Sequence, residues 1–301
     1  MNFPARLMIV ACCAAVSPVA FAQDFANARI VTEQIDDGLY VFFAQGEGVI
    51  AGNMLVSIGD SGVLLVDDQV PGIAPKYKAA IAQLGGGAID FAINTHWHFD
   101  HADGNQVLGN EGAWFVAQEN SRQMMLRDNV INLVNQTLVQ PAYGEKARPV
   151  FTYDSTMRVH FNGDRIDLMH FGPAHTTGDT AVIFRDRNLV HLGDVFNTSG
   201  YPFIDADNGG SLAGVIAFCE AVLGELEPGA VVIPGHGAIS DYQGLADYVA
   251  MLKTVRERIS SLISSGASLE QVIAARPTSD WDAAMGDPGM LLDRAYASMT
   301  R

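Results

Sequence analysis

Three histidines and one aspartate fall within six residues of the chain, in the run Thr95-His96-Trp97-His98-Phe99-Asp100-His101. In an extended segment the side chains of His96, His98 and Asp100 share one face, because side chains alternate along an extended backbone. His101 joins them where the chain turns, and the following Ala102-Asp103-Gly104 has the residue types that favour a turn. Neutral imidazole and carboxylate are good zinc ligands, whereas burying four such groups without a metal is costly. The run therefore predicts a metal site that contains all four side chains.

Three further ligand candidates lie later in the chain. His175 lies in the stretch 172–179, Asp194 ends the apolar run 189–194, and His236 lies in the stretch 232–237. Each of them follows or ends a predicted buried strand and has a glycine nearby, which lets the backbone approach a crowded centre. The candidates now number seven, five histidines and two aspartates, which is enough for two metal ions.

The order of these motifs resembles that of the metallo-β-lactamase superfamily. The resemblance comprises the H-x-H-x-D-H run at 96–101, the Gly-x-x-His ending at His175, the Gly-Asp ending at Asp194 and the Pro-Gly-His-Gly around His236. It extends over essentially the whole chain after the N-terminal segment. The implied fold is α/β (α+β), a four-layer αβ/βα sandwich with the site at one edge of the two sheets.

The resemblance also implies a role for each candidate ligand. A first zinc ion would be held by His96, His98 and His175, a second by Asp100, His101 and His236, and Asp194 would bridge both. In such a centre the two ions share a hydroxide and lie roughly 3.5–4 Å apart. The hydroxide would attack a substrate carbonyl, the second zinc would stabilise the leaving anion, and Asp100 would accept or pass on a proton.

Two residues shortly after Asp194 are candidates for stabilising the negative charge that develops on the substrate. Asn197 and Tyr201 each carry a hydrogen-bond donor that suits an oxyanion. Packing beside the site as ordinary loop residues is an equally weighted alternative for both. The remaining histidines outside the motifs, His160, His170 and His191, lie in predicted strands and are interpreted as packing or supporting residues, not ligands.

The elements that must position these residues follow from hydrophobic periodicity and turn signals. We predict strands at 28–32, 38–44, 54–58, 62–66, 88–94, 114–117, 156–161, 165–171, 180–184, 189–192 and 230–233. Helices are expected at 74–84, 104–108, 119–127, 211–226 and 241–264, followed by two shorter helices, and a long loop at 136–149. Mixed strands and helices in two similar halves predict two sheets packed face to face with helices outside.

The first 22 residues have the pattern of a signal peptide. Arg6 provides a positive charge, 7–16 is apolar but too short to span a bilayer, and Ala20-Phe21-Ala22 is typical of a cleavage site. We therefore expect a hydrolase domain at 23–301 and a periplasmic or secreted protein. The alternative is a lipoprotein anchored at Cys12. After cleavage Cys219 would be the remaining cysteine, and its apolar helical surroundings predict a buried thiol.

Charge and export limit the substrate. The formal net charge is −16 and the pI is about 4.7, which excludes nucleic acid and gives no basic patch for anionic lipid. We expect a small-molecule substrate and no stable membrane association after cleavage. The favoured function is hydrolysis of an amide or ester bond, most readily a cyclic one such as a β-lactam or a lactone. Within the resemblance, an aspartate at position 194 is typical of generalist hydrolases, whereas dedicated lactamases carry cysteine or serine there.

Three alternatives remain open at this point. One is a thioester hydrolase of the glyoxalase II kind, which export disfavours. The second is a persulfide dioxygenase with a single iron held by two histidines and an aspartate, which would leave His101 without a metal to bind. The third is a zinc-binding or partner-binding protein that has lost catalysis, which the complete ligand set disfavours.

Overall fold

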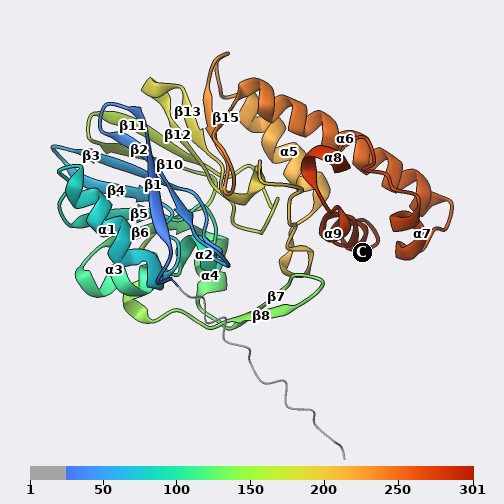
Figure 1. Cartoon of the computed structure of the whole chain (residues 1–301), viewed down its shortest axis with the longest axis horizontal. Coiled ribbons are helices and arrows are strands. Elements are labelled where there is room, and N and C mark those ends of the chain that lie inside the picture. The colour runs from blue at the N-terminus through green and yellow to red at the C-terminus, as the bar shows by residue number, and fades with distance from the viewer. Residues whose placement is uncertain (1–24) are drawn as a thin grey trace, which may run out of the picture.

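The computed structural model describes residues 25–301, in which two β-sheets face each other between outer layers of helices (Figure 1). The predicted signal segment 1–22 and the alternative lipid anchor at Cys12 lie outside the described residues. Within the described part, no helix is long and apolar enough to cross a membrane.

The first sheet has seven strands in the order β1-β2-β3-β4-β5-β6-β9. Their bounds are Arg29–Asp36, Leu39–Gln45, Met54–Gly59, Gly62–Val66, Ile89–Ile93, Trp114–Gln118 and Phe151–Tyr153. The strands β1 to β4 form an antiparallel meander, and β4, β5, β6 and β9 run parallel to one another. Because β4 and β5 are parallel, the residues that follow them emerge at the same edge of the sheet.

The second sheet has six strands in the order β10 to β15. Their bounds are Thr156–Phe161, Asp164–Met169, Ala181–Phe184, Leu189–His191, Val231–Ile233 and Ser240–Asp241. Strands β13 and β14 are a parallel pair within an otherwise antiparallel sheet. The chain after β13 and the chain after β14 therefore also leave the sheet at one common edge.

Aliphatic side chains from both sheets form the core between them. Leu55, Leu64 and Ile93 from the first sheet are fully buried in one cluster with Leu168 and Val182 from the second. The helices α1 (Ala74–Gln83) and α3 (Asn105–Glu111) pack on the outside of the first sheet. The outside of the second sheet is covered by α5 (Leu212–Leu223), α6 (Tyr242–Ser264) and α9 (Gly289–Met299). This arrangement confirms the predicted four-layer αβ/βα sandwich.

The predicted loop at 136–149 is in part wrong. Strand β8 (Thr137–Gln140) occupies its first part and pairs with β7 (Asn129–Asn132) in a two-stranded hairpin, which projects below the sheets in Figure 1. Its inward side chains Ile131 and Leu138 pack in a cluster with the fully buried Trp97. The hairpin forms because alternate residues of two short strands find this apolar surface, which the local sequence period does not reveal.

Three further differences concern short elements. The predicted helix near Gly104 is preceded by a separate short helix, α2 (Phe99–Ala102), and the predicted strand 165–171 ends at Met169. The chain finishes with three helices instead of two, α7 (Leu269–Ala274), α8 (Asp282–Met285) and α9. Helix α4 (Glu119–Met125) stands where a helix was predicted, and Cys219 is buried in α5 as expected.

Candidate metal centre

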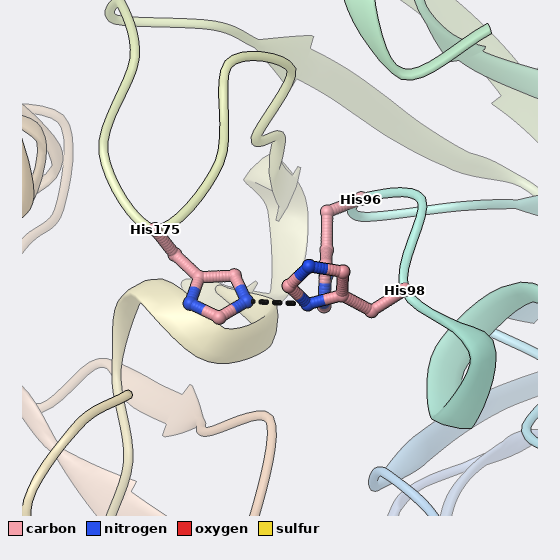
Figure 2. A group of neighbouring side chains, drawn as sticks. All are labelled: His96, His98 and His175. Atoms are coloured by element: carbon pink, nitrogen blue, oxygen red, sulfur yellow. Dashed lines mark hydrogen bonds between the residues drawn. The ribbon is translucent and has the colours of Figure 1, made fainter. Parts of the chain in front are cut away.

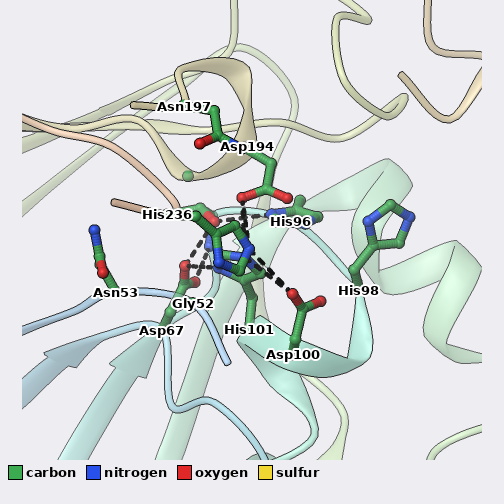
Figure 3. Close-up of polar contacts among 12 residues, drawn as sticks. Gly52, Asn53, Asp67, His96, His98, Asp100, His101, Asp194, Asn197 and His236 are labelled. Carbon is green, nitrogen blue, oxygen red and sulfur yellow. Dashed lines mark hydrogen bonds and ion pairs between the residues drawn. The ribbon is translucent and has the colours of Figure 1, made fainter. Parts of the chain in front are cut away.

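The seven candidate ligands come together at one edge of the two sheets; Figure 3 labels six of them, and Figure 2 labels the seventh, His175. The run 96–101 follows β5, Asp194 follows β13 in the turn η4 (Gly193–Val195), and His236 follows β14. Their convergence has a simple cause, because parallel strands present the residues after their carboxyl ends at the same edge. Gly52 and Gly235 permit the crowding: a Cβ atom at Gly52 would overlap the His101 ring, and one at Gly235 would overlap a carboxylate oxygen of Asp194.

His96, His98 and His175 form the first group, and their ligand atoms lie within 4.8 Å of one another (Figure 2). The Nε2 atom of His175 lies 2.9 Å from Nδ1 of His98. The outward nitrogen of each ring has a partner: Thr95 Oγ1 at 3.0 Å for His96, Asp205 Oδ2 at 2.9 Å for His98, and the Phe203 carbonyl at 2.9 Å for His175. These partners orient the rings so that one nitrogen of each faces a common point.

Asp100, His101, Asp194 and His236 form the second group. The Nε2 atom of His101 lies 3.0 Å from Asp194 Oδ1 and 3.2 Å from His236 Nε2, and His236 Nε2 lies 3.1 Å from Asp100 Oδ2. The other oxygen of Asp194, Oδ2, lies 3.7 Å from His175 Nε2 in the first group. The carboxylate of Asp194 therefore stands between the two groups, as Figure 3 shows from its position above the histidine rings.

The two groups differ in their electrostatics. Burial, together with the neighbouring imidazoles, lowers the pKa of His96 well below its usual value, and burial also lowers the pKa of His175. In the second group burial acts in the same direction on the histidines, but the carboxylates outweigh it, so the pKa of His101 rises and that of His236 reaches about 9. Burial would raise the pKa of Asp194, yet the nearby His236 and His101 hold it well below its usual range. The second group is therefore a place that favours positive charge.

The residues fit metal ions. Two buried polar atoms, His96 Nε2 and Asp194 Oδ1, have no hydrogen-bond partner in the structure, although a buried polar atom normally has one. Asp194 Oδ1 does lie 3.0 Å from His101 Nε2, but not in hydrogen-bond geometry. In the pairs His98–His175 and His101–His236 a ring nitrogen faces another ring nitrogen. A cation between two such nitrogens stabilises this arrangement, because both lone pairs can bind it. Once the rings are deprotonated, as ligand imidazoles must be, their nitrogens and the carboxylate oxygens form a donor set that suits zinc.

Two carboxylates that support the ligands were not predicted. Asp67 directly follows β4, accepts hydrogen bonds from Thr95 N at 2.7 Å and Thr95 Oγ1 at 2.8 Å, and lies 2.7 Å from His101 Nδ1. Its sequence signal was available, because Asp67 and Asp68 come immediately after a buried strand. Asp205 lies in a loop far from any motif, so only the folded chain reveals its pairing with His98.

The two predicted oxyanion donors are placed differently. Asn197 lies beside Asp194 at the rim of the cluster, with its side-chain oxygen accepting bonds from Ser199 N and Oγ, both at 2.8 Å (Figure 3). The Tyr201 hydroxyl points to α8, 3.0 Å from Asp282 Oδ1 and 3.1 Å from the Thr278 carbonyl oxygen. Burial and the Asp282 carboxylate raise its pKa to about 12. The structure thus does not bring Tyr201 to the cluster, and the oxyanion role of either residue stays a prediction.

The other histidines lie outside both groups. His160 is exposed on β10, and Nδ1 of His170 lies 2.8 Å from the Asp179 carbonyl oxygen. His191 is fully buried at the end of β13; its Nε2 lies 3.1 Å from the Asn53 carbonyl oxygen, and its Nδ1 accepts a hydrogen bond from Gly193 N at 3.2 Å. His191 thus fixes the turn that carries Asp194, in agreement with the supporting role predicted for it.

Comparisons with known proteins agree with this geometry. A profile described as "Metallo-beta-lactamase superfamily" matches residues 48–253. A curated relative, "2,4-dinitroanisole O-demethylase subunit alpha" from Nocardioides sp. (strain JS1661), is 25% identical over 142 residues, which are 46% of this chain and 40% of that protein. This chain therefore spans less than half the length of that relative.

Solved structures show the same fold. A metallo-beta-lactamase from Pontibacter korlensis superposes with a TM-score of 0.60 at 15% identity, covering 75% of this chain and 99% of its own. The DIM-1 metallo-beta-lactamase gives a TM-score of 0.59 at 17% identity, covering 75% and 98%. At these identities the likeness concerns the fold alone.

Proposed function

The chain belongs to the metallo-beta-lactamase superfamily, and from this premise we propose that it is an exported dinuclear zinc hydrolase. The proposed substrate is a small molecule with an amide or ester bond in a ring, such as a β-lactam or a lactone. The observation that carries the proposal is the placement of Asp194, whose two carboxylate oxygens face two adjacent groups of ligand atoms. A carboxylate that faces both groups is what a two-metal hydrolase requires.

The proposed ligand sets follow the two groups. His96, His98 and His175 would hold one zinc ion, Asp100, His101 and His236 the other, and Asp194 would touch both. When bound, the zinc ions would supply a hydroxide at neutral pH and polarise the scissile carbonyl.

The residues of the chain contribute orientation and proton handling. Asp205 and Asp67 fix the ring orientations of His98 and His101, which leaves the opposite nitrogens free for metal. Burial acts to raise the pKa of Asp100, but His101 and His236 hold it below its usual value, so this carboxylate is ionised at neutral pH. An ionised Asp100 is able to accept the proton of the attacking water and return it to the leaving nitrogen or oxygen.

A metal analysis with a hydrolysis panel tests the proposal. The purified zinc-replete protein is expected to contain two zinc ions per chain and to open a lactone or β-lactam ring. The panel includes carbapenems, cephalosporins, N-acyl homoserine lactones, thioesters and phosphodiesters, and an aryl methyl ether because of the activity in the curated relative's name. One iron per chain with oxygen consumption on a persulfide would replace the proposal by the dioxygenase alternative. Two zinc ions with no turnover on any member would favour a binding protein.

Export has its own test. The signal pattern at 1–22 leads us to propose cleavage after Ala22 and a periplasmic or secreted location. The intact mass of the protein from its native host is expected to correspond to a chain that begins at Gln23. A mature protein that retains Met1, or that carries lipid on Cys12, would contradict this proposal.

A further inference from the structure

A groove of about 740 Å³ begins at His236 and runs along the strands β1 and β2. We infer that this groove binds the arm of the substrate beyond the scissile bond, and that it selects arms without negative charge. This inference rests on the proposed function and deepens it by naming the substrate class. His236 connects the groove to the metal centre, since 23% of its side chain is exposed and the other six candidate ligands are more deeply buried.

The walls of the groove are about half apolar and half polar. One wall comes from β1, β2 and the loop after them, and the other comes from the segment after His236. Its aliphatic and aromatic lining includes Val31, Phe43, Val49, Ala51, Ala238 and Ile239. Asn53 ties the two walls together, because its side-chain amide donates to the carbonyl oxygens of Pro234 and Gly237, both at 2.9 Å. The apolar part of this lining can bury apolar ligand surface, while the polar part offers hydrogen-bonding groups to the arm.

In the zinc-loaded protein His236 would be a neutral metal ligand, so the formal charge in the groove would come from Glu33. Apart from His236, Glu33 is the one ionisable side chain among the described residues that line it. Arg29 lies two residues before Val31 on β1, but its guanidinium donates to Gln45 Oε1 at 3.1 Å. A carboxylate on the substrate arm would therefore meet Glu33 without a lining cation to pair with.

The metal centre itself does not compensate for this negative charge. Four aspartates contact the candidate ligands or belong to them: Asp67, Asp100, Asp194 and Asp205. Their combined formal charge balances two divalent cations, so the loaded centre offers no large excess of positive charge to a distant carboxylate. The formal net charge of −16 adds a long-range repulsion of anions.

A matched set of three ligands tests the inference. Each is a γ-lactone with an amide arm of the same length, ending in a methyl, a trimethylammonium or a carboxylate group. Binding to the zinc-loaded protein is measured by calorimetry with the matching tetrahydrofuran analogues, which lack the scissile carbonyl and cannot be hydrolysed, and kcat/KM is measured with the lactones. We expect the carboxylate ligand to bind roughly fivefold or more weakly than the methyl ligand, because two like unit charges about 4 Å apart repel by about 1 kcal/mol even in bulk water. The difference is expected to shrink as salt is added.

Variants separate the groove from the overall charge. Glu33→Lys is expected to abolish or reverse the preference against the carboxylate arm, and Glu33→Gln to reduce it. Glu257→Lys makes the same change in net charge at an exposed position of α6 and is expected to leave the preference unchanged. Equal or tighter binding of the carboxylate ligand, the same response to both lysine variants, or no measurable binding of any ligand would overturn the inference. Absence of turnover with the expected order of binding would instead overturn the proposed hydrolase activity and leave the groove preference standing.

Discussion

At the scale of single residues, Asp194 is the side chain on which the two-metal proposal depends most. It is the aspartate whose carboxylate faces both groups of ligand atoms, with oxygen-to-nitrogen distances of 3.0 Å to His101 and 3.7 Å to His175. We expect Asp194→Ala to lose most of the second zinc ion and at least a hundredfold in turnover, because the two ions lose their shared ligand. Asp194→Cys is expected to retain more metal, since a thiolate also binds zinc.

Elemental analysis and turnover on the same preparations measure these effects. Asp164→Asn is the matched control, because Asp164 is also buried but pairs with Arg187 away from the metal centre. The two-metal proposal would be wrong if Asp194→Asn kept both metal ions and near-normal turnover on every substrate.

Asp205 provides a second test at the residue scale. Its carboxylate lies 2.9 Å from His98 Nε2 and accepts two further hydrogen bonds from the Asn208 amide, at 2.9 and 3.0 Å. We expect Asp205→Ala to weaken zinc binding at the first group about 10- to 100-fold, because His98 loses the partner that fixes its ring and tautomer.

Competition with a chromogenic chelator measures that affinity. Asp207→Ala is the control, since Asp207 lies two residues away and bonds to Arg294 and Asn132 but to no candidate ligand. If both variants weakened zinc binding equally, the effect would come from the loop and not from the pairing of Asp205 with His98.

The ligands could be predicted from the sequence, whereas most of their supporting residues could not. A metal ligand belongs to a small set of residue types, and the run His96 to His101 places four of them together. The partner of His98 is settled only when the loop containing Asp205 folds back across the site. Nothing in the local sequence distinguishes that aspartate from Asp207, which is exposed. The same reason explains why Tyr201 looked suitable yet lies against α8.

At the scale of elements, the site depends on parallel strand ends and on the loops that pack against them. Gly52 lies in the loop between β2 and β3; its N–H donates to the Asp100 carbonyl oxygen at 2.9 Å, and its carbonyl accepts from Gln69 Nε2 at 2.7 Å. A side chain at this position has no space, because its Cβ atom would overlap the His101 ring. We therefore expect Gly52→Ala to displace His101 and to lower occupancy of the second metal position more than that of the first.

Two measurements distinguish this effect from general destabilisation. Metal content per chain is compared with the melting temperature of the metal-free protein, in which His101 has no zinc to hold. Gly87→Ala is the control, because a Cβ atom there meets nothing within 4 Å. Full occupancy of both metal positions in Gly52→Ala would show that the loop yields without disturbing His101.

Strand prediction succeeded where apolar runs are continuous and failed where elements are short. The central strands β4 and β12 are buried almost throughout, so their apolar runs are clear in the sequence. The hairpin of β7 and β8 has four residues per strand and exposes Val130 and Val139 on its outer side. Its pattern therefore resembles that of a loop, and its structure depends on contact with Trp97.

At the scale of the whole molecule, the order of the motifs along the chain predicted the arrangement of the sheets and the position of the site, which the local pattern of each motif did not. Each metal motif follows a strand, so their order along the chain also fixes the order of the strands that carry them. That order indicated two sheets with the site at their common edge, which the topology confirms. Which groove lies next to the site could not be predicted, because it depends on how the β1–β2 hairpin packs against the segment after His236.

The free energy of unfolding of the whole molecule is expected to depend on the protonation of His191. This ring is fully buried, and burial lowers its pKa to about 4 from an ordinary value of 6.5. Its two hydrogen-bond contacts, to the Asn53 carbonyl oxygen and from Gly193 N, suit the neutral ring. Because the pKa of His191 is lower in the folded protein, the unfolded chain takes up this proton at a higher pH than the folded protein does as the pH falls. The contribution of neutral His191 to stability is therefore complete above pH 6.5 and is lost as the pH falls from 6.5 towards 4, by up to about 3 kcal/mol.

Urea unfolding of the metal-free protein between pH 7.5 and pH 4.5 measures this loss, with His191→Gln as the comparison. Glutamine retains an amide donor for the Asn53 carbonyl but does not titrate, so we expect a less stable variant whose stability falls less steeply towards low pH. Asp103 titrates in the same range with the opposite sign, because burial raises its pKa to about 6 and its protonation favours the folded state as the pH falls. Asp103 is present in both proteins, so the difference between the two curves isolates His191. Parallel curves would show that His191 does not remain neutral in the folded protein down to the lower end of this range.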